Sequence, residues 1–393
     1  MNIAKVEDCF GCGVCAVVCS RNAINIKLNI KGFYQPFLDE TRCSGCGLCA
    51  DVCSFLHKET ALSLQPICSY GMWSNDPKIR HICSSGGVGY ELGKYLIGQG
   101  YNVCCVRYNP DMHRAEHYIA TNIQELIPSI GSKYIQSYTF DGFSSINRKD
   151  KYLVTGTPCQ IDSFRRYIRR YRVEDNFVLM DFFCHSVPSM LAWRKYLQFV
   201  ENITGPVCSV SWRNKFTGWH DSWAMELCGQ YENRNEKCFK AGKGGRTYRS
   251  RLSQGDIFYK LFLGDYCCNP ACQNDCKYKY DKSSADIRIG DFWGDTYIKD
   301  EEGVSAAVAY TEKGKRILHS LDCTIEEHIF EVVAEGQMKK NAGQAYTSKL
   351  VFKALNNESS TEHTFRNIFR LEAILSLPKK VYNKIKRIIW EKS

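Results

Sequence analysis

Apolar residues alternate with polar ones in several short segments of the chain, which is the period of a β-strand with one buried face. Two such segments lie on either side of Lys31-Gly32 and predict a β-hairpin. One further strand ends in the motif Gly290-Asp291-Phe292-Trp293-Gly294. The predicted strands are 23–30 and 32–38 in the hairpin, then 101–108, 151–155, a strand ending near Phe182, and 286–289.

Two other segments carry apolar residues three and four positions apart, the period of an amphipathic helix. Residues 88–96 predict the first helix, and residues 161–168 predict the second. Thr157 is suited to cap the second helix, and Pro158 fits its first position. The first helix precedes the strand 101–108 and the second follows the strand 151–155, which favours α/β units in the middle of the chain.

The composition is that of a folded protein without a membrane span. The chain has 393 residues, of which 44% are apolar and 24% charged, and this length allows two to four domains. No apolar segment reaches the roughly 18 residues that span a bilayer. The first residues, MNIAKVEDCFGC, contain no apolar signal-peptide core. We therefore expect a cytoplasmic protein.

The net charge of +10 is unevenly distributed. Basic residues gather at 165–172, at 240–251 and in the last eighteen residues. No nucleic-acid-binding motif accompanies them, so we expect no nucleic-acid partner. In residues 375–389, apolar and basic positions alternate at helical spacing, which is compatible with peripheral contact at the inner membrane surface. The alternative is that this helix packs on its own protein or only solvates the terminus.

Cysteine is the unusual component, with 22 residues in the chain. Because the cytosol keeps thiols reduced, metal binding explains so many cysteines better than disulfides do. Two runs have the spacing C-x2-C-x2-C-x3-C, which is the spacing of bacterial two-cluster ferredoxins. The runs are Cys9, Cys12, Cys15 and Cys19, and then Cys43, Cys46, Cys49 and Cys53.

In this spacing the fourth cysteine of each run reaches the other cluster. The first [4Fe–4S] cluster, cluster one, is therefore assigned to Cys9, Cys12, Cys15 and Cys53. Cluster two is assigned to Cys43, Cys46, Cys49 and Cys19. A pair of zinc sites is the alternative, but zinc has no use for this interleaved spacing. Serine follows the fourth cysteine of each run where proline is usual, so the local turn is expected to be looser.

Cys267, Cys268, Cys272 and Cys276 form another group within ten residues. They predict a third [4Fe–4S] cluster, with a structural zinc or no metal as the alternatives. Three further segments are candidate sites for an anion or a nucleotide cofactor. These are Cys83–Gly89, Gly131–Ser137 with Lys133, and Gly156–Gln160, where the helix dipole would lower the pKa of the Cys159 thiol. A capped helix, a solvated loop and a buried thiol are the respective alternatives.

The ferredoxin runs are followed by six further segments, in the order CSSGG, GSKYIQS, GTPCQ, FFCHSVPS, CNPACQNDC and IRIGDFWG. Together, these motifs resemble the beta subunits of coenzyme F420-reducing hydrogenases and dehydrogenases. The resemblance covers residues 5–345. It implies FAD and [4Fe–4S] clusters, with coenzyme F420 as a possible substrate. The residues implied to bind the flavin are Ser84, Ser85, Gly86, Gly87, Ser132, Lys133, Tyr134, Gln136, Thr155, Gly156, Thr157 and Gln160.

The resemblance also implies ligands for the third cluster. Cys267, Cys272 and Cys276 match the family's last cysteine group, although the final gap is one residue longer than expected. Cys268 is an extra thiol that could replace Cys267. Cys184 is the preferred fourth ligand and Cys159 the second choice. Cys159 and Lys133 are the candidate catalytic residues.

Together these observations predict an α+β protein: an N-terminal two-[4Fe–4S] ferredoxin module followed by two α/β parts of a flavin and iron–sulfur domain. The predicted boundaries are 1–62 for the ferredoxin module, a linker through 66–77, 78–158 and 159–345 for the α/β parts, and 346–393 for a basic helical tail.

Three functions fit. The first is a flavin-dependent oxidoreductase acting on a small organic molecule or a deazaflavin, and relatives of this kind often accompany polysaccharide-synthesis genes. The second is a non-catalytic electron-transfer subunit that serves a partner enzyme. The third is a protein whose clusters are structural or sensory. For the first two we expect a redox partner protein or a small electron carrier.

Overall fold

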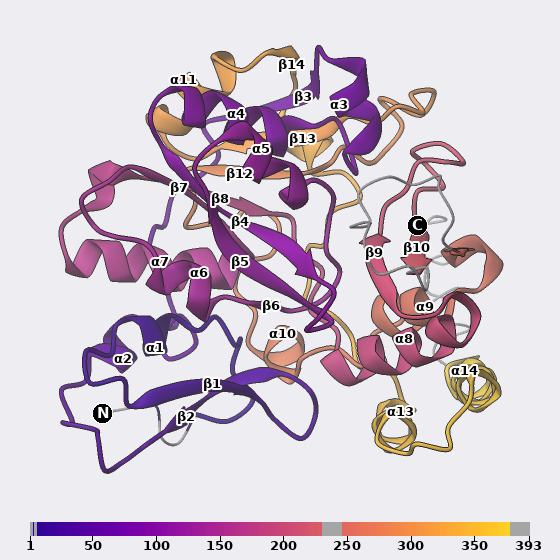
Figure 1. The fold of residues 1–393 in the computed structure, drawn as a ribbon. Coiled ribbons are helices and arrows are strands. Elements are labelled where there is room, and N and C mark those ends of the chain that lie inside the picture. Colours follow the sequence, from indigo (N-terminus) through magenta and orange to yellow (C-terminus); the bar gives the residue numbers. More distant parts are fainter. Residues whose placement is uncertain (1–2, 4–5, 230–245, 378–393) are drawn as a thin grey trace, which may run out of the picture.

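The computed structural model of the chain describes residues 3, 6–229 and 246–377. Within these residues, one large mixed sheet organises the molecule (Figure 1), in the strand order β14-β3-β13-β12-β8-β7-β4-β5-β6. Its strands are β3 (Cys68–Ser74), β4 (Asn102–Asn109), β5 (Arg114–Ala120), β6 (Ser137–Tyr138), β7 (Tyr152–Thr155), β8 (Phe177–Phe182), β12 (Ile287–Asp291), β13 (Ser305–Ala309) and β14 (Cys323–Glu327).

The middle of this sheet is the core of the molecule. Strands β4, β7, β8 and β12 run parallel to one another, and β13 pairs antiparallel to both β12 and β3. β8 and β13 are buried almost throughout, as expected for strands covered on both faces. The helices around the sheet are α3 (Pro77–Ile82), α4 (Val88–Gly98), α5 (Ile123–Leu126), α6 (Phe140–Ser144), α7 (Pro158–Arg170), α11 (Glu312–His319) and α12 (Phe330–Val333).

The hairpin and both helices predicted from the sequence are present. β1 (Ile24–Leu28) and β2 (Tyr34–Leu38) pair antiparallel, with Ile24 opposite Leu38. Thr157 and Gln160 form a capping box at the start of α7, with Pro158 in its first turn. Local sequence signals therefore fix these elements.

The described residues of the predicted ferredoxin module, 3 and 6–62, pack directly on the large sheet. The module contains β1, β2, α1 (Val14–Val17) and α2 (Leu48–Asp51). Its apolar residues, among them Val14 and Val18, belong to the same core cluster as Phe143 of α6 and Phe164 of α7. Figure 1 shows the module below α6 and α7, at the lower left of the view. The module and the sheet thus share one hydrophobic core.

Two boundaries predicted from the sequence do not separate structural units. The expected linker at 66–77 contains β3, a buried strand between β14 and β13. The expected parts 78–158 and 159–345 both contribute strands to the large sheet, because β7 pairs with β8. A polar, glycine-containing segment here forms a strand because its neighbours cover it. The α+β fold class itself is confirmed.

A smaller sheet lies beside the large one, in the order β11-β10-β9. It is packed by α8 and α9, and it appears on the right in Figure 1. Its elements are β9 (Val207–Ser211), β10 (Ala224–Gly229), β11 (Thr247–Arg251), α8 (Met190–Thr204) and α9 (Ile257–Leu263), and α10 (Pro270–Asn274) follows.

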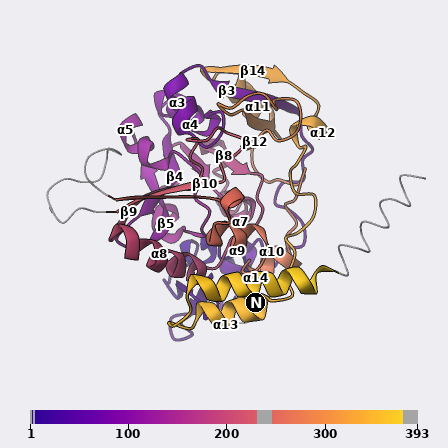
Figure 2. The ribbon, with the colours of Figure 1, turned by 90° about the vertical axis from the view of Figure 1, so that its right-hand side faces the viewer.

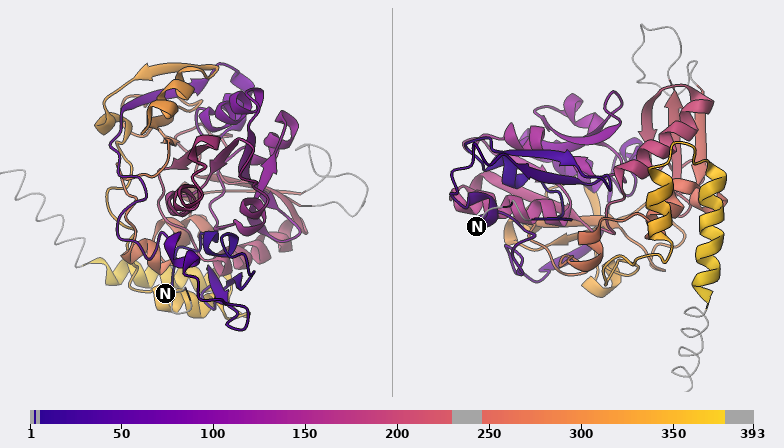
Figure 3. Two further views of the ribbon diagram at one scale, coloured as in Figure 1. Left: turned by 90° about the vertical axis from the view of Figure 1, so that its left-hand side faces the viewer. Right: turned by 90° about the horizontal axis from the view of Figure 1, so that it is seen from below.

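The last described helices are α13 (Ser348–Leu355) and α14 (Glu362–Leu375), which lie side by side (Figures 2 and 3). They pack on α8 and α9 through Val351 and Phe365. Most of the predicted basic amphipathic segment 375–389 lies outside the described residues. In the described part of the chain, no helix combines the length and the apolar character needed to cross a membrane.

Candidate metal centres

Cys9, Cys12, Cys15 and Cys53 line one pocket in the ferredoxin module. Gly11 and Gly13 have φ values of 68° and 74°, which lets the loop wrap around the pocket. Phe10, Phe55 and Pro36 complete its apolar wall. Burial raises the pKa of the Cys9 thiol to about 12 and that of Cys53 to about 11. Such thiols become thiolates at neutral pH when a metal replaces their protons.

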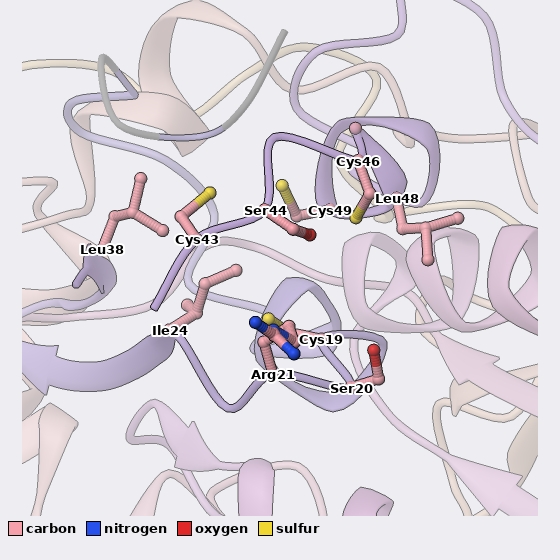
Figure 4. Close-up of a pocket in the computed structure, with 11 residues that line it drawn as sticks. Cys19, Ser20, Arg21, Ile24, Leu38, Cys43, Ser44, Cys46, Leu48 and Cys49 are labelled. Carbon is pink, nitrogen blue, oxygen red and sulfur yellow. The ribbon is translucent and has the colours of Figure 1, made fainter. Parts of the chain in front are cut away.

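Cys19, Cys43, Cys46 and Cys49 line a second pocket (Figure 4). Cys19 comes from the first cysteine run and the other three come from the second run. The two pockets therefore have the crossed arrangement that the spacing predicts. Cys46 is exposed, and a hydrogen bond from the Leu48 amide lowers the pKa of its thiol. The second pocket thus lies at the molecular surface, whereas the first is buried.

Four thiols from three distant segments form a third group: Cys159, Cys184, Cys272 and Cys276. Burial raises the pKa of Cys159 well above its usual value, and the neighbouring thiols of Cys272 and Cys184 raise it further. Burial likewise raises the pKa of Cys272 to about 12, with Cys184 and Cys276 adding to the effect. Cys159 and Cys276 also pack against one apolar cluster, which contains Phe10 and Tyr278. We call these four cysteines the third thiol set.

The sheet topology explains why these residues meet. Cys159 follows β7 and Cys184 follows β8, and these parallel neighbours end at the same edge of the sheet. Cys272 lies in α10, and Cys276 lies just beyond it. The carboxyl edge of parallel strands is the usual place for a binding site in such sheets.

Cys267, predicted as a ligand of the third cluster, does not belong to this set. It is fully buried in an apolar cluster with Leu261 and Val351, and its thiol donates to the Leu261 carbonyl oxygen at 3.7 Å. Its position in the loop before α10 turns it toward α9 and α13. Sequence proximity to Cys272 suggested otherwise, because spacing does not reveal side-chain direction.

The prediction that the helix dipole lowers the pKa of Cys159 is also wrong. The thiol lies in the first turn of α7, but burial outweighs the dipole and raises the pKa. A buried thiol among three others is suited to bind metal rather than to act as a nucleophile. The structure thus favours Cys159 over Cys267 as a ligand of the third cluster. The sequence analysis places Cys159 second, after Cys184, as the fourth ligand.

The first pocket and the third thiol set are joined by α7. Ser163 lies one turn after Cys159 on that helix, and the Cys12 thiol donates to its Oγ at 3.2 Å. The same Oγ accepts a hydrogen bond from the Ser54 amide at 2.9 Å, and Ser54 Oγ donates to the Cys159 carbonyl oxygen at 3.1 Å. From the other side, the Asn269 side chain donates to the Cys9 carbonyl oxygen at 3.0 Å. Short polar contacts therefore connect the two groups of thiols.

The predicted flavin segments also meet at the carboxyl edge of the large sheet. Ser84 Oγ accepts a hydrogen bond from the Ser132 amide at 2.8 Å, which joins the turn before α4 to the loop before β6. Lys133 Nζ donates to the carbonyl oxygens of Ser129, Ile130 and Gly131 at 2.7, 3.0 and 2.9 Å. Burial lowers the pKa of this lysine to about 8.

Lys215 is another lysine near this turn; its side chain is buried, and sequence analysis missed it. Its Nζ donates to the carbonyl oxygens of Ser85 and Arg80, both at 2.7 Å, and burial lowers its pKa to about 8. Among the described residues, neither Lys133 nor Lys215 forms an ion pair with a carboxylate. Lys215 belongs to no glycine motif, and only the fold brings it to this turn.

Several predicted flavin residues are already engaged with the protein. Gln136 Oε1 accepts from the Tyr34 amide at 2.9 Å, and its Nε2 donates to the Phe10 carbonyl oxygen at 3.2 Å. Gln136 therefore links the loop before β6 to the ferredoxin module. A Cβ at Gly86 would lie 2.3 Å from the Met72 carbonyl oxygen, so the close packing of this turn against β3 requires glycine here.

The remaining predicted flavin residues are held by contacts with other residues at the carboxyl edge of the large sheet. Ser85 Oγ donates to the Val304 carbonyl oxygen, Tyr134 OH accepts from Arg213, and Thr155 Oγ1 donates to the Cys104 carbonyl oxygen. Gly156 leaves room for the Gln160 side chain, whose Oε1 accepts from the Thr157 amide at 2.9 Å. Gly87 caps α4 with a φ of 91°.

Two family models match the chain. Residues 8–55 match the 4Fe-4S dicluster domain, and residues 149–332 match the C terminus of the coenzyme F420 hydrogenase/dehydrogenase beta subunit. No curated protein matches the sequence. A solved chain of the F420-reducing [NiFe] hydrogenase complex from Methanosarcina barkeri, studied by xenon derivatization, is 15% identical. The match covers 83% of this chain and 96% of that chain, with a TM-score of 0.44.

Proposed function

Because the chain is a member of the coenzyme F420 hydrogenase/dehydrogenase beta subunit family and carries a 4Fe-4S dicluster domain, we propose that it passes electrons between three [4Fe–4S] clusters, a flavin and a small organic substrate. Cluster one takes Cys9, Cys12, Cys15 and Cys53; cluster two takes Cys19, Cys43, Cys46 and Cys49. The third cluster takes Cys159, Cys184, Cys272 and Cys276.

One observation carries this proposal: the third thiol set lies at the carboxyl edge of the sheet and packs against Phe10 and Phe55 of the ferredoxin module. Cys12 contacts Ser163, one turn from Cys159 on α7. Cluster two is the outermost site, since Cys46 is exposed. The proposed order is therefore cluster two, cluster one, third cluster and then the edge of the sheet.

The residues at this edge fit an anionic cofactor. Among the described residues, the ammonium groups of half-buried Lys133 and buried Lys215 have only carbonyl partners, and they flank the turn before α4. Buried lysines without a carboxylate partner suit the pyrophosphate of FAD, and the start of α4 adds a favourable dipole. FAD bound here would exchange single electrons with the clusters and electron pairs with a substrate. Lys133 and Lys215 would hold the phosphates in place.

The substrate class we propose is a small organic molecule or a deazaflavin, of which coenzyme F420 is the example in the family's description. A place in polysaccharide biosynthesis is a weaker proposal, since only the resemblance of the sequence motifs suggests it. The redox partner is a protein or a small electron carrier that reaches cluster two.

The exposure of Cys46 also favours a second function, a non-catalytic electron-transfer subunit that serves a partner enzyme. The two functions differ in what reduces the bound flavin. A small molecule that turns over with the isolated protein supports the oxidoreductase, whereas flavin reduction only in the presence of a partner protein supports the subunit.

Iron content tests the third cluster and its ligands. After anaerobic purification of the full chain we expect about twelve irons per chain, four in each cubane. Cys159→Ala and Cys184→Ala should lower this to about eight. Cys267→Ala is the matched control and should keep all three clusters, because that thiol faces the apolar core.

The opposite results would contradict the proposal. About eight irons in the unmodified chain would mean that the third thiol set holds no cluster. Loss of iron from Cys267→Ala, but not from Cys159→Ala, would restore the ligand set that the sequence suggested. Flavin extraction from the same samples tests the proposed FAD. If protein with full iron content released no flavin, the proposal would be reduced to the iron–sulfur clusters.

A further inference from the structure

A group of three metal-binding side chains lies beside the third thiol set but does not belong to it. His185 follows Cys184 after β8, and Asp265 and Cys268 lie between α9 and α10. One donor atom from each of the three residues lies within 4.8 Å of the other two. We propose that Cys268, His185 and Asp265 bind a single zinc ion with an open fourth position.

The distances fit a zinc ion after small side-chain movements. His185 Nε2 lies 2.9 Å from Asp265 Oδ1, and Cys268 Sγ lies 3.6 Å from the same oxygen. Donor atoms in a tetrahedral zinc site with bonds of about 2.0–2.3 Å are roughly 3.3–3.8 Å apart. The two separations from Asp265 Oδ1 lie close to this range, and the donor atoms of His185 and Cys268 lie within 4.8 Å of each other, so side-chain movements can close the site.

The charges also fit a divalent cation. A Cys268 thiolate and the Asp265 carboxylate together carry two negative charges, and neutral His185 adds none. Among the described residues, His185 is the only ion-pair partner of Asp265, so no Lys or Arg neutralises the group. Zn²⁺ would make the site neutral overall. Thiolate, imidazole and carboxylate are the three side-chain donors that zinc uses in proteins.

Outer contacts hold two of the three donors in place. Ser186 Oγ donates to Cys268 Sγ at 2.9 Å, and the Gly343 amide donates to Asp265 Oδ2 at 2.7 Å. Partners of this kind orient the ligands of metal sites. Asp265 has a φ of 60°, a left-handed conformation that is unfavourable for a residue with a side chain. The fold therefore keeps Asp265 in an unfavourable backbone conformation, with its carboxylate turned toward His185.

The imidazole ring is oriented as well. Phe262 packs against His185 edge to face, with the ring centroids 5.1 Å apart. Lys279 Nζ donates to the carbonyl oxygens of Cys184 and His185 at 2.7 and 2.5 Å, which ties down the backbone that carries the ring. Both contacts leave Nε2 directed at Asp265.

The site has an open side. Cys268 is only 2% exposed, but the side chains of His185 and Asp265 are 23% and 22% exposed. Zinc sites with three protein ligands bind water or a substrate oxygen in the fourth position. The ligand class is therefore a small molecule with an oxygen or nitrogen donor, bound one residue away from Cys184 of the third thiol set.

Zinc content of the full chain tests the proposal. Protein purified anaerobically with its clusters is mixed with an equimolar amount of zinc chloride, desalted and analysed for zinc and iron. We expect about one zinc ion in the unmodified chain, and none in Cys268→Ser or Asp265→Asn, with the same iron content throughout. Asp265→Asn keeps the shape of the side chain, so loss of zinc there does not reflect misfolding.

Cys267→Ala is the matched control. It removes the adjacent thiol, which faces the apolar core, and should bind zinc like the unmodified chain. X-ray absorption spectra at the zinc edge should show one sulfur scatterer at about 2.3 Å from the bound ion and nitrogen or oxygen scatterers at about 2.0–2.1 Å. The proposal is overturned if the unmodified chain binds no zinc, or if both variants retain it. Iron loss from Cys268→Ser would instead assign Cys268 to the third cluster.

Discussion

Ser163 contacts Cys12, a proposed ligand of cluster one, from helix α7. It is fully buried on α7, and its Oγ lies 3.2 Å from Cys12 Sγ. The Ser54 amide donates to this oxygen, so the hydroxyl hydrogen is left to point at the sulfur once Cys12 is a thiolate. Hydrogen bonds to cluster sulfurs stabilise the more negative, reduced state and raise the reduction potential.

We therefore expect Ser163→Ala to lower the reduction potential of cluster one. A loss of about 1 kcal/mol in the interaction with the reduced state corresponds to roughly 40 mV in a one-electron couple. Redox titration followed by electron paramagnetic resonance measures the change. Cluster two is the internal control, because the sulfur that Ser163 contacts at 3.2 Å belongs to Cys12, a proposed ligand of cluster one. Equal shifts of both clusters, or no shift, would show that this hydrogen bond does not tune cluster one.

At the scale of elements, the turn between β1 and β2 is a second attachment of the ferredoxin module. Gly32 has a φ of 77°, and its carbonyl oxygen accepts a hydrogen bond from the Met190 amide at the start of α8. Ser189 Oγ donates to the Lys31 carbonyl oxygen at 2.6 Å. A Cβ on Gly32 would lie 2.6 Å from Ser189 Oγ and 2.9 Å from the Leu191 amide nitrogen.

Gly32→Ala should therefore loosen the hairpin from α8. The variant pays about 1–2 kcal/mol for the left-handed backbone and a further 1–3 kcal/mol for the overlap with α8. Gly100→Ala is the matched control, since Gly100 has a φ of 79° but open space around a Cβ. Thermal unfolding and limited proteolysis after residue 62 compare the two variants. If both are destabilised equally, the contact of Gly32 with α8 contributes nothing.

At the scale of the whole molecule, the thiol groups are ordered from the surface to the interior. The pocket proposed for cluster two lies at the outer end, the pocket proposed for cluster one is buried next to α7, and the third thiol set lies at the carboxyl edge of the sheet. An external protein donor can approach cluster two most closely. In the proposed order of clusters, the ferredoxin module would extend the electron path to the surface.

Cys19→Ala tests this order, because Cys19 lines the pocket of cluster two although it belongs to the first cysteine run. We expect the loss of about four irons, all from cluster two. Reduction of the remaining clusters by a protein donor should slow strongly, whereas reduction by the small reductant dithionite should change little. Bleaching of the visible iron–sulfur absorbance in rapid mixing measures both rates. Unchanged reduction by the protein donor would place its entry point elsewhere.

The sequence alone was sufficient to predict the two ferredoxin clusters, the hairpin, and the helix starts at Gly87 and Thr157. Their determinants are local: the ligands of each proposed cluster lie within one short module, and caps and turns depend on a few neighbouring residues. The tertiary structure decided that Cys159 joins Cys184 and Cys272, while Cys267 turns into the core. It also brought Lys215 to the turn at Ser85. These placements follow from the pairing of β7 with β8 and from side-chain direction, which spacing along the chain does not contain.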